Sequence, residues 1–132
     1  TNKYTGNSLC GSFRYSISTI DFEGAFNCHC IDCRRATGSA FAAVVPFKID
    51  NFNGDVSVLK KLTHKGGSGN DVHRYCFQDC YCPIYNNVTL SGGTYLYAGT
   101  LDNISDITFS ENYNYENGHF EFINISDKKV EI

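Results

Sequence analysis

The chain has 132 residues, a length typical of one domain, and its 42% apolar and 19% charged residues are those of an ordinary soluble globular protein. The formal net charge is −3 and there is no basic tract, which argues against nucleic acid as a partner, because phosphate binding requires clustered Lys and Arg. The longest apolar run, residues 40–47, is too short to span a membrane, and the N-terminus shows no secretory or transit segment. From the length we expect a single domain over residues 1–132.

Alternation of apolar and polar residues predicts short strands along the chain. In residues 12–18, Phe13, Tyr15 and Ile17 share one face. The unbroken apolar run 40–45 is typical of a strand that is covered on both faces. Further alternating segments are residues 55–59, 93–99 and 119–123. These segments predict a mostly β fold.

Turn signals separate the predicted strands at residues 53–54, 65–70, 91–93 and 117–118. Residues 66–70 are rich in glycine but lack the Lys-Ser/Thr of a phosphate-binding loop, so a hairpin turn is the better interpretation. No long helical periodicity is present. Residues 30–38 predict at most one helical turn, which ends at Gly38.

Four aromatic residues lie at alternate positions of the predicted strands. They are Tyr95, Tyr97, Phe120 and Phe122. Aromatic side chains in this pattern usually pack across strands. We therefore interpret them as packing residues and not as a cage for a ligand.

The spacing of the cysteines indicates a metal site. Six of the seven cysteines fall into two tight groups, Cys28/Cys30/Cys33 and Cys76/Cys80/Cys82, whereas disulfide frameworks usually spread their cysteines along the chain. Three thiolates from one short loop can occupy three corners of a tetrahedron around zinc. The fourth corner would stay open, as in catalytic zinc sites, and a soft ligand set suits an incoming thiolate.

Other interpretations of the first cysteine group remain open. Cys30 and Cys33 form a Cys-x-x-Cys pair that could be redox-active, although such motifs usually accompany a βαβ pattern that is absent here. His29 lies between two ligating cysteines, so its side chain should point away. Arg34 and Arg35 could pair with the carboxylates of an anionic substrate or could be solvated surface charges.

The second cysteine group has two interpretations. Cys10 precedes the first predicted strand and could join two or three of Cys76, Cys80 and Cys82 in a closed structural zinc site. Alternatively, Cys10 and Cys80 could form a disulfide if their geometry allows it.

These residues resemble one known family. The segment CHCIDCRRATGSAF, preceded by LCGSFRY and followed by RYCFQDCYCPIY and AGTLD, resembles the glutathione-dependent formaldehyde-activating enzyme family, whose relatives include centromere protein V. The resemblance covers residues 6–102. It implies a β-tent fold of several small coiled antiparallel sheets, zinc bound by Cys28, Cys30 and Cys33, and glutathione as the thiol whose adduct with formaldehyde is formed or broken.

The chain departs from the family pattern at the implied structural zinc site. Ser8 stands where the family has the first cysteine of a Cys-x-Cys pair, of which Cys10 keeps the second. Further along, Cys80 matches the last cysteine of the late motif, but Phe77 stands at its partner's position and Cys76 is displaced by one residue. A strand residue displaced by one points to the opposite face. Tyr81 replaces the usual glycine, Cys82 is an additional thiol, and the tail lacks the tryptophan that family members often carry there.

The leading hypothesis is a zinc-dependent carbon–sulfur lyase that acts on a glutathione–aldehyde adduct. The alternative is a non-catalytic binding module of the same fold, stabilised by zinc or by disulfides. We expect a cytoplasmic protein, or in the alternative a secreted one. Three glycosylation sequons begin at Asn87, Asn103 and Asn124, but about two would arise by chance in a chain so rich in Asn, Ser and Thr, so they do not decide the compartment. No general base is evident, because the four histidines are scattered along the chain.

Overall fold

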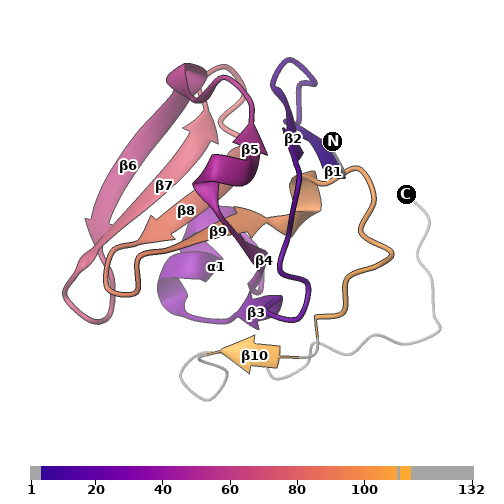
Figure 1. Cartoon of the computed structure of the whole chain (residues 1–132). Helices are drawn as coiled ribbons and strands as arrows, with labels where there is room; N and C mark the ends of the chain where they lie inside the picture. Colours follow the sequence, from indigo (N-terminus) through magenta and orange to yellow (C-terminus); the bar gives the residue numbers. More distant parts are fainter. Residues whose placement is uncertain (1–3, 110, 114–132) are drawn as a thin grey trace, which may run out of the picture.

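A computed structural model describes residues 4–109 and 111–113 of the chain (Figure 1). Its strands are β1 (Tyr4–Asn7), β2 (Arg14–Ile17), β3 (Phe26–Cys28), β4 (Ala42–Phe47), β5 (Phe52–Asn53), β6 (Leu59–Lys65), β7 (Asp71–Phe77), β8 (Pro83–Val88), β9 (Gly93–Tyr97) and β10 (Glu111–Tyr113). Between them lie the helix α1 (Ile31–Thr37) and the 3₁₀ turns η1 (Ile49–Asn51), η2 (Val56–Val58) and η3 (Ala98–Thr100). Among the described residues, no helix has both the length and the apolar character needed to cross a membrane.

The described strands form two sheets. A three-stranded sheet has the order β1-β2-β5, and a seven-stranded sheet has the order β10-β3-β4-β9-β8-β7-β6. All pairs are antiparallel except β10 and β3, which run parallel and lie side by side in Figure 1. Both orders are open, so neither sheet closes into a barrel. This arrangement confirms the predicted mostly β fold. It also agrees with the antiparallel β-tent that the family resemblance implies.

Three of the predicted strands are present. In β2 the alternation places Tyr15 and Ile17 in the core, with Phe13 buried just before the strand. The apolar run becomes β4, a strand inside the large sheet that is buried along most of its length. The segment predicted at residues 93–99 becomes β9, which pairs with β4 and with β8. Alternation therefore identified strands where one face, or both, packs against the core.

The strand predicted at residues 55–59 is wrong. Asp55 accepts a hydrogen bond from the Ser57 backbone N–H at 3.1 Å, and this cap begins the turn η2. Local capping by an aspartate side chain competes with an extended backbone, so the strand starts only at Leu59. The strand predicted at residues 119–123, with Phe120 and Phe122, lies outside the described residues.

The main core fills the space between the two sheets. Its fully buried side chains include Ile17 of the small sheet and Val45, Ile84 and Leu96 of the large one. A second, smaller apolar cluster joins Cys28 and Cys33 to residues of β4 and β9. The cysteine segment is thus anchored to the large sheet by packing, which holds its thiols in place.

Candidate metal centre

The three cysteines of the first group meet where β3 passes into α1. Cys28 is the last residue of β3, Cys30 caps the N-terminus of α1, and Cys33 lies in the helix. The Cys30 sulfur accepts a hydrogen bond from the Cys33 backbone N–H at 3.3 Å, which satisfies a donor left unpaired by the first helical turn. Gly38 ends the helix in the left-handed region with φ of 67°, as predicted, but α1 spans about two turns and not one.

The geometry of the three sulfurs fits a tetrahedral metal. Their Sγ atoms all lie within 4.8 Å of one another, and those of Cys28 and Cys30 are 3.4 Å apart. Zinc–sulfur bonds of about 2.3 Å in a tetrahedron would place ligand sulfurs about 3.8 Å apart, within this range. Of the described residues, these alone gather three such ligand atoms so closely. The cluster could therefore hold a metal ion.

The three thiols influence one another's pKa. Hydrogen bonds from the thiols of Cys28 and Cys33 lower the pKa of Cys30. The hydrogen bond to Cys30 raises the pKa of Cys28, and hydrogen bonds with Cys28 and then with Cys30, together with burial, raise the pKa of Cys33. One thiolate is thus stabilised at the expense of its neighbours, because adjacent negative charges repel. A divalent cation would allow all three to ionise together.

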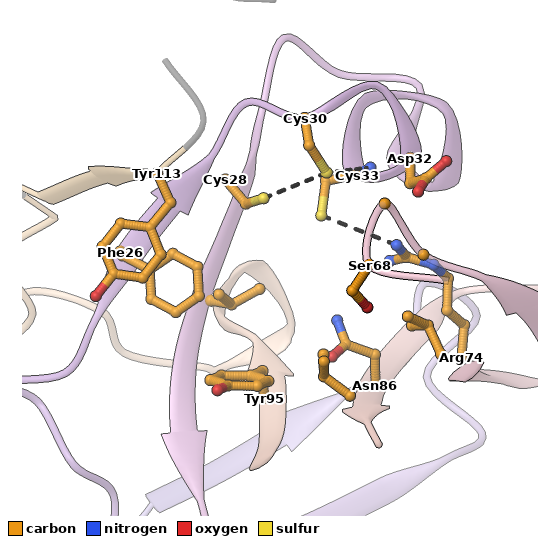
Figure 2. Close-up of a pocket in the computed structure, with 15 residues that line it drawn as sticks. Phe26, Cys28, Cys30, Asp32, Cys33, Ser68, Arg74, Asn86, Tyr95 and Tyr113 are labelled. Carbon is orange, nitrogen blue, oxygen red and sulfur yellow. Dashed lines mark hydrogen bonds between the residues drawn. The ribbon is translucent and has the colours of Figure 1, made fainter. Parts of the chain in front are cut away.

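A pocket of about 280 Å³ opens beside the cluster (Figure 2). The three cysteines form part of its wall. Aromatic side chains contribute another part, namely Phe26, Tyr95 and Tyr113. Tyr95 meets Phe26 edge-on with ring centroids 5.6 Å apart, as expected for cross-strand packing, but it lines the pocket as well. Its interpretation as a packing residue alone was therefore incomplete.

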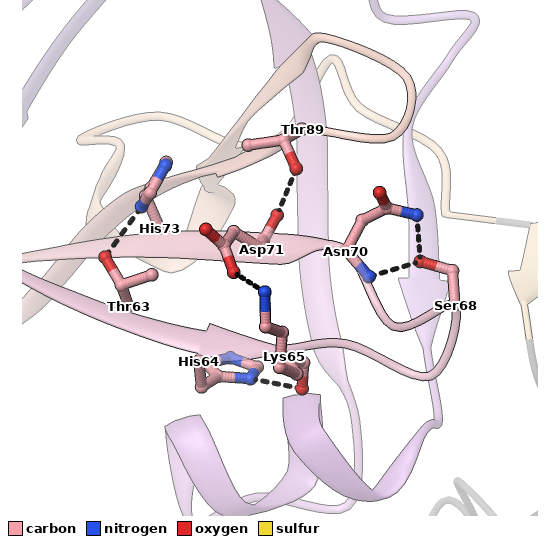
Figure 3. Close-up of polar contacts among 8 residues, drawn as sticks. All are labelled: Thr63, His64, Lys65, Ser68, Asn70, Asp71, His73 and Thr89. Atoms are coloured by element: carbon pink, nitrogen blue, oxygen red, sulfur yellow. Dashed lines mark hydrogen bonds and ion pairs between the residues drawn. The ribbon is translucent and has the colours of Figure 1, made fainter.

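The hairpin turn between β6 and β7 supplies a further wall of the pocket through Gly66, Gly67 and Ser68. Figure 3 shows the polar contacts that shape this turn. The Asn70 backbone N–H and side-chain N–H donate to Ser68 Oγ, each at 3.3 Å, and Lys65 pairs with Asp71 at 2.7 Å. The prediction of a hairpin turn here is confirmed. What the sequence did not reveal is that the turn reaches the cysteine cluster.

Strand β10 holds the cysteine loop from the other side. Its parallel pairing with β3 places Tyr113 next to Cys28, and the Tyr113 carbonyl accepts from the His29 backbone N–H at 2.9 Å. The His29 ring is buried, with Nε2 2.9 Å from Asn112 Oδ1, and it packs near Phe41. His29 thus points away from the cysteine cluster, as predicted, and acts as a packing residue.

Arg34 and Arg35 do not line the pocket that the described residues form. The Arg34 Nε–H donates to the His29 carbonyl at 3.3 Å, and Arg35 is exposed. Their contact with substrate carboxylates stays a prediction.

The cation at the pocket is Arg74 of β7, which the sequence analysis did not identify. Its Nη2–H donates to Cys33 Sγ at 3.9 Å and its Nη1–H to Tyr97 Oη at 2.6 Å. Burial alone would lower the pKa of Arg74, but Tyr97 and Cys33 raise it above its ordinary value, so the guanidinium stays charged. The only signal in the sequence was a charged residue in the interior of a strand, and charged residues are rarely buried unless paired. Asn86 of β8, a second pocket residue, gave no sequence signal at all.

None of the seven cysteines, all of which lie in the described part of the chain, forms a disulfide in the structure. Cys80 and Cys82 pack against the main core, of which Phe77 is a member. Cys76, the residue before Phe77 in β7, is not part of that core, as expected because neighbouring strand residues point to opposite faces. The Cys80 side chain adds to the lowering of the Cys10 pKa, after the larger contributions of Ser8 and Ser12. The second cysteine group does not draw three sulfurs together as the first does, and both the second zinc and the Cys10–Cys80 disulfide stay predictions.

Cys10 is expected to be the most reactive exposed thiol of the metal-free protein. The Ser8 hydroxyl, 3.5 Å from Cys10 Sγ, and a Ser12 backbone hydrogen bond lower the pKa of Cys10 to about 7. Since a lowered pKa extends the thiolate form to lower pH, its alkylation rate should be half-maximal at about pH 7, against about pH 8.5 for an ordinary thiol. Mass spectrometry of iodoacetamide labelling between pH 5.5 and 9 measures this. Ser8→Ala should move the midpoint upward; an unmoved midpoint would contradict the assignment to Ser8.

Comparisons with known proteins agree with this arrangement. A sequence model of the family described as glutathione-dependent formaldehyde-activating enzyme matches residues 3–117. No match is found among curated proteins. Among solved structures, the crystal structure of a Rhodobacter sphaeroides protein is similar, with 15% sequence identity, a TM-score of 0.55, and coverage of 80% of this chain and 99% of that chain. At this identity the structural likeness concerns the fold alone.

Proposed function

Because the chain belongs to the glutathione-dependent formaldehyde-activating enzyme family, we propose that it is a zinc-dependent carbon–sulfur lyase that acts on a glutathione–aldehyde adduct of the S-hydroxymethylglutathione type. The observation that carries the proposal is the placement of three thiols, within 4.8 Å of one another, in the wall of a pocket. Family membership supplies glutathione as the thiol, and the sulfur-rich ligand set favours zinc.

In this proposal Cys28, Cys30 and Cys33 hold the metal. Zinc bound there would supply Lewis acidity and favour the thiolate form of glutathione. The chain's own residues contribute the rest. Phe26, Tyr95 and Tyr113 give the pocket an apolar wall that excludes water from the reacting atoms.

The ends of glutathione require other partners. Arg34 and Arg35, on the helix that also carries Cys33, would pair with the carboxylates of glutathione from outside the pocket through the two-pronged geometry of the guanidinium.

The reaction itself tests the proposal. Formaldehyde and glutathione combine without a catalyst, so the measurement must follow exchange between free and adducted glutathione, for example by magnetisation transfer in NMR with ¹³C-formaldehyde. We expect the exchange rate to rise in proportion to the concentration of zinc-loaded protein. Heat-denatured protein with the same amount of zinc is the control. A protein that carries zinc and binds glutathione without accelerating exchange would instead be the non-catalytic binding module.

A further inference from the structure

Arg74 is held rigidly at the edge of the metal cluster. Its Nε–H donates to His64 Nε2 at 2.8 Å, while its two terminal nitrogens donate to Tyr97 Oη and Cys33 Sγ. His64 accepts this bond as a neutral ring, since its other nitrogen, Nδ1, lies 3.0 Å from the Lys65 carbonyl and donates to it. A guanidinium has five N–H donors. The three contacts leave two of them for a ligand.

Asn86 presents the opposite chemistry beside it. Its side chain is only 5% exposed, and its Nδ2–H donates to the same Tyr97 oxygen at 3.4 Å. Its Oδ1 is buried and has no hydrogen-bond partner in the structure. An unpaired buried carbonyl is destabilising, so a buried oxygen of this kind in a pocket wall indicates a missing donor. Through their shared hydrogen bonds to Tyr97 Oη, the unused N–H donors of Arg74 and the unpaired Oδ1 acceptor of Asn86 lie next to each other.

The position of this pair narrows what it can bind. Arg74 Nη2 lies 3.9 Å from Cys33 Sγ, so a group that contacts Arg74 lies next to whatever the metal cluster holds. In a glutathione–formaldehyde adduct, the hydroxymethyl oxygen is separated from the sulfur by a single carbon. Both carboxylates of glutathione lie much further from the sulfur along the molecule. Figure 2 shows Arg74 and Asn86 on one side of the pocket, and Phe26 and Tyr113 on the other.

We propose that Arg74 and Asn86 form the oxygen-binding subsite of the reaction proposed above, on which this inference rests. In the direction of adduct formation, the glutathione thiolate forms a bond to the aldehyde carbon, and the π electrons of the carbonyl move onto its oxygen. The N–H groups of Arg74 donate to that oxygen as it becomes negative. The oxygen then takes from water the proton that the glutathione thiol released on becoming a thiolate, and the new hydroxyl donates to Asn86 Oδ1.

Charge explains why a cation is required at this position. Three thiolates and one zinc ion have a net charge of about −1, which would repel a developing alkoxide. A fixed guanidinium counters this repulsion and needs no reorganisation during the reaction, because Tyr97 and His64 already orient it. In the reverse direction the same contacts hold the hydroxymethyl group until the carbon–sulfur bond breaks, the pair returns to sulfur and the proton returns to water.

The test compares two ligands in the zinc-loaded protein: glutathione alone, and glutathione with excess formaldehyde, each titrated by isothermal calorimetry. Arg74→Met removes the donors but keeps an unbranched side chain in place of the aliphatic part of arginine, and Asn86→Leu removes the acceptor. We expect both variants to bind glutathione within about twofold of the unmodified protein. The affinity for the adduct should fall about 10–100-fold in Arg74→Met and about 3–10-fold in Asn86→Leu.

Two further variants keep the result interpretable. Arg14→Met removes an exposed arginine of β2 outside the pocket and should change neither affinity. Arg74→Lys keeps the positive charge, so it should fold even if the methionine variant does not, and it should lose part of the preference for the adduct. A ratio of adduct to glutathione affinity that is unchanged in folded, zinc-containing Arg74 variants would overturn the subsite alone. An unmodified protein that binds neither ligand would overturn the proposed function and the subsite together.

Discussion

Replacement of Cys33 by serine is expected to release the metal and to lower the catalysed exchange at least about 100-fold. Loss of a residue that only supports a metal ligand typically costs about 10–100-fold, so loss of a ligand should cost at least the upper end of that range. Cys33 is buried and sits between the other two thiols and Arg74, and no other His, Cys, Asp or Glu of the described residues joins this group to take its place. Metal analysis by mass spectrometry should give about one zinc per chain at this site before the change, and far less after it.

A second serine variant on the same helix separates metal loss from damage to the fold. Ile31 is 47% exposed and does not line the pocket, so Ile31→Ser should keep the metal and stay within about twofold of the original rate. Circular dichroism should show that both variants keep the strands. If Cys33→Ser retained its zinc and its turnover, the assignment of the metal to this cluster would be wrong.

Leu96→Ala is expected to reduce the free energy of unfolding by about 2–5 kcal/mol. Leu96 is fully buried in β9, at the centre of the large sheet, where it pairs with Val45 and Tyr85. Shortening it leaves a cavity that the two neighbouring strands cannot close. Since β9 also carries Tyr95 and Tyr97, the damage should extend to the pocket. Denaturant titration with an unchanged m-value measures the loss.

Leu90→Ala is the matched control for this change. Leu90 lies in the turn before β9 and is 65% exposed, so the same substitution should alter the free energy of unfolding by no more than about 0.5 kcal/mol. Equal losses in the two variants would contradict the placement of β9 inside the core.

Sequence patterns were reliable where one strand or turn determined the outcome. The alternation of Phe13, Tyr15 and Ile17 marked a strand because every second side chain meets the core. Gly38 marked the end of α1 because the left-handed backbone conformation that ends a helix favours glycine. The same reasoning failed at residues 55–59, where the Asp55 side chain captures a nearby backbone N–H and produces a 3₁₀ turn instead.

The sequence by itself determined the mostly β fold and the cysteine cluster. Cys28, Cys30 and Cys33 lie within six residues, so the short loop and the first turn of α1 bring their sulfurs close together, and the large sheet then holds them in place.

Only the tertiary structure decided what faces these sulfurs. Arg74 reaches Cys33 across 41 positions of the chain, and Asn86 and Tyr113 arrive from still more distant strands. Such contacts depend on the order and register of β10, β3, β4, β9, β8 and β7 in one sheet. Which strands pair, and in which register, depends on how the whole core packs, so no short segment of the sequence determines it.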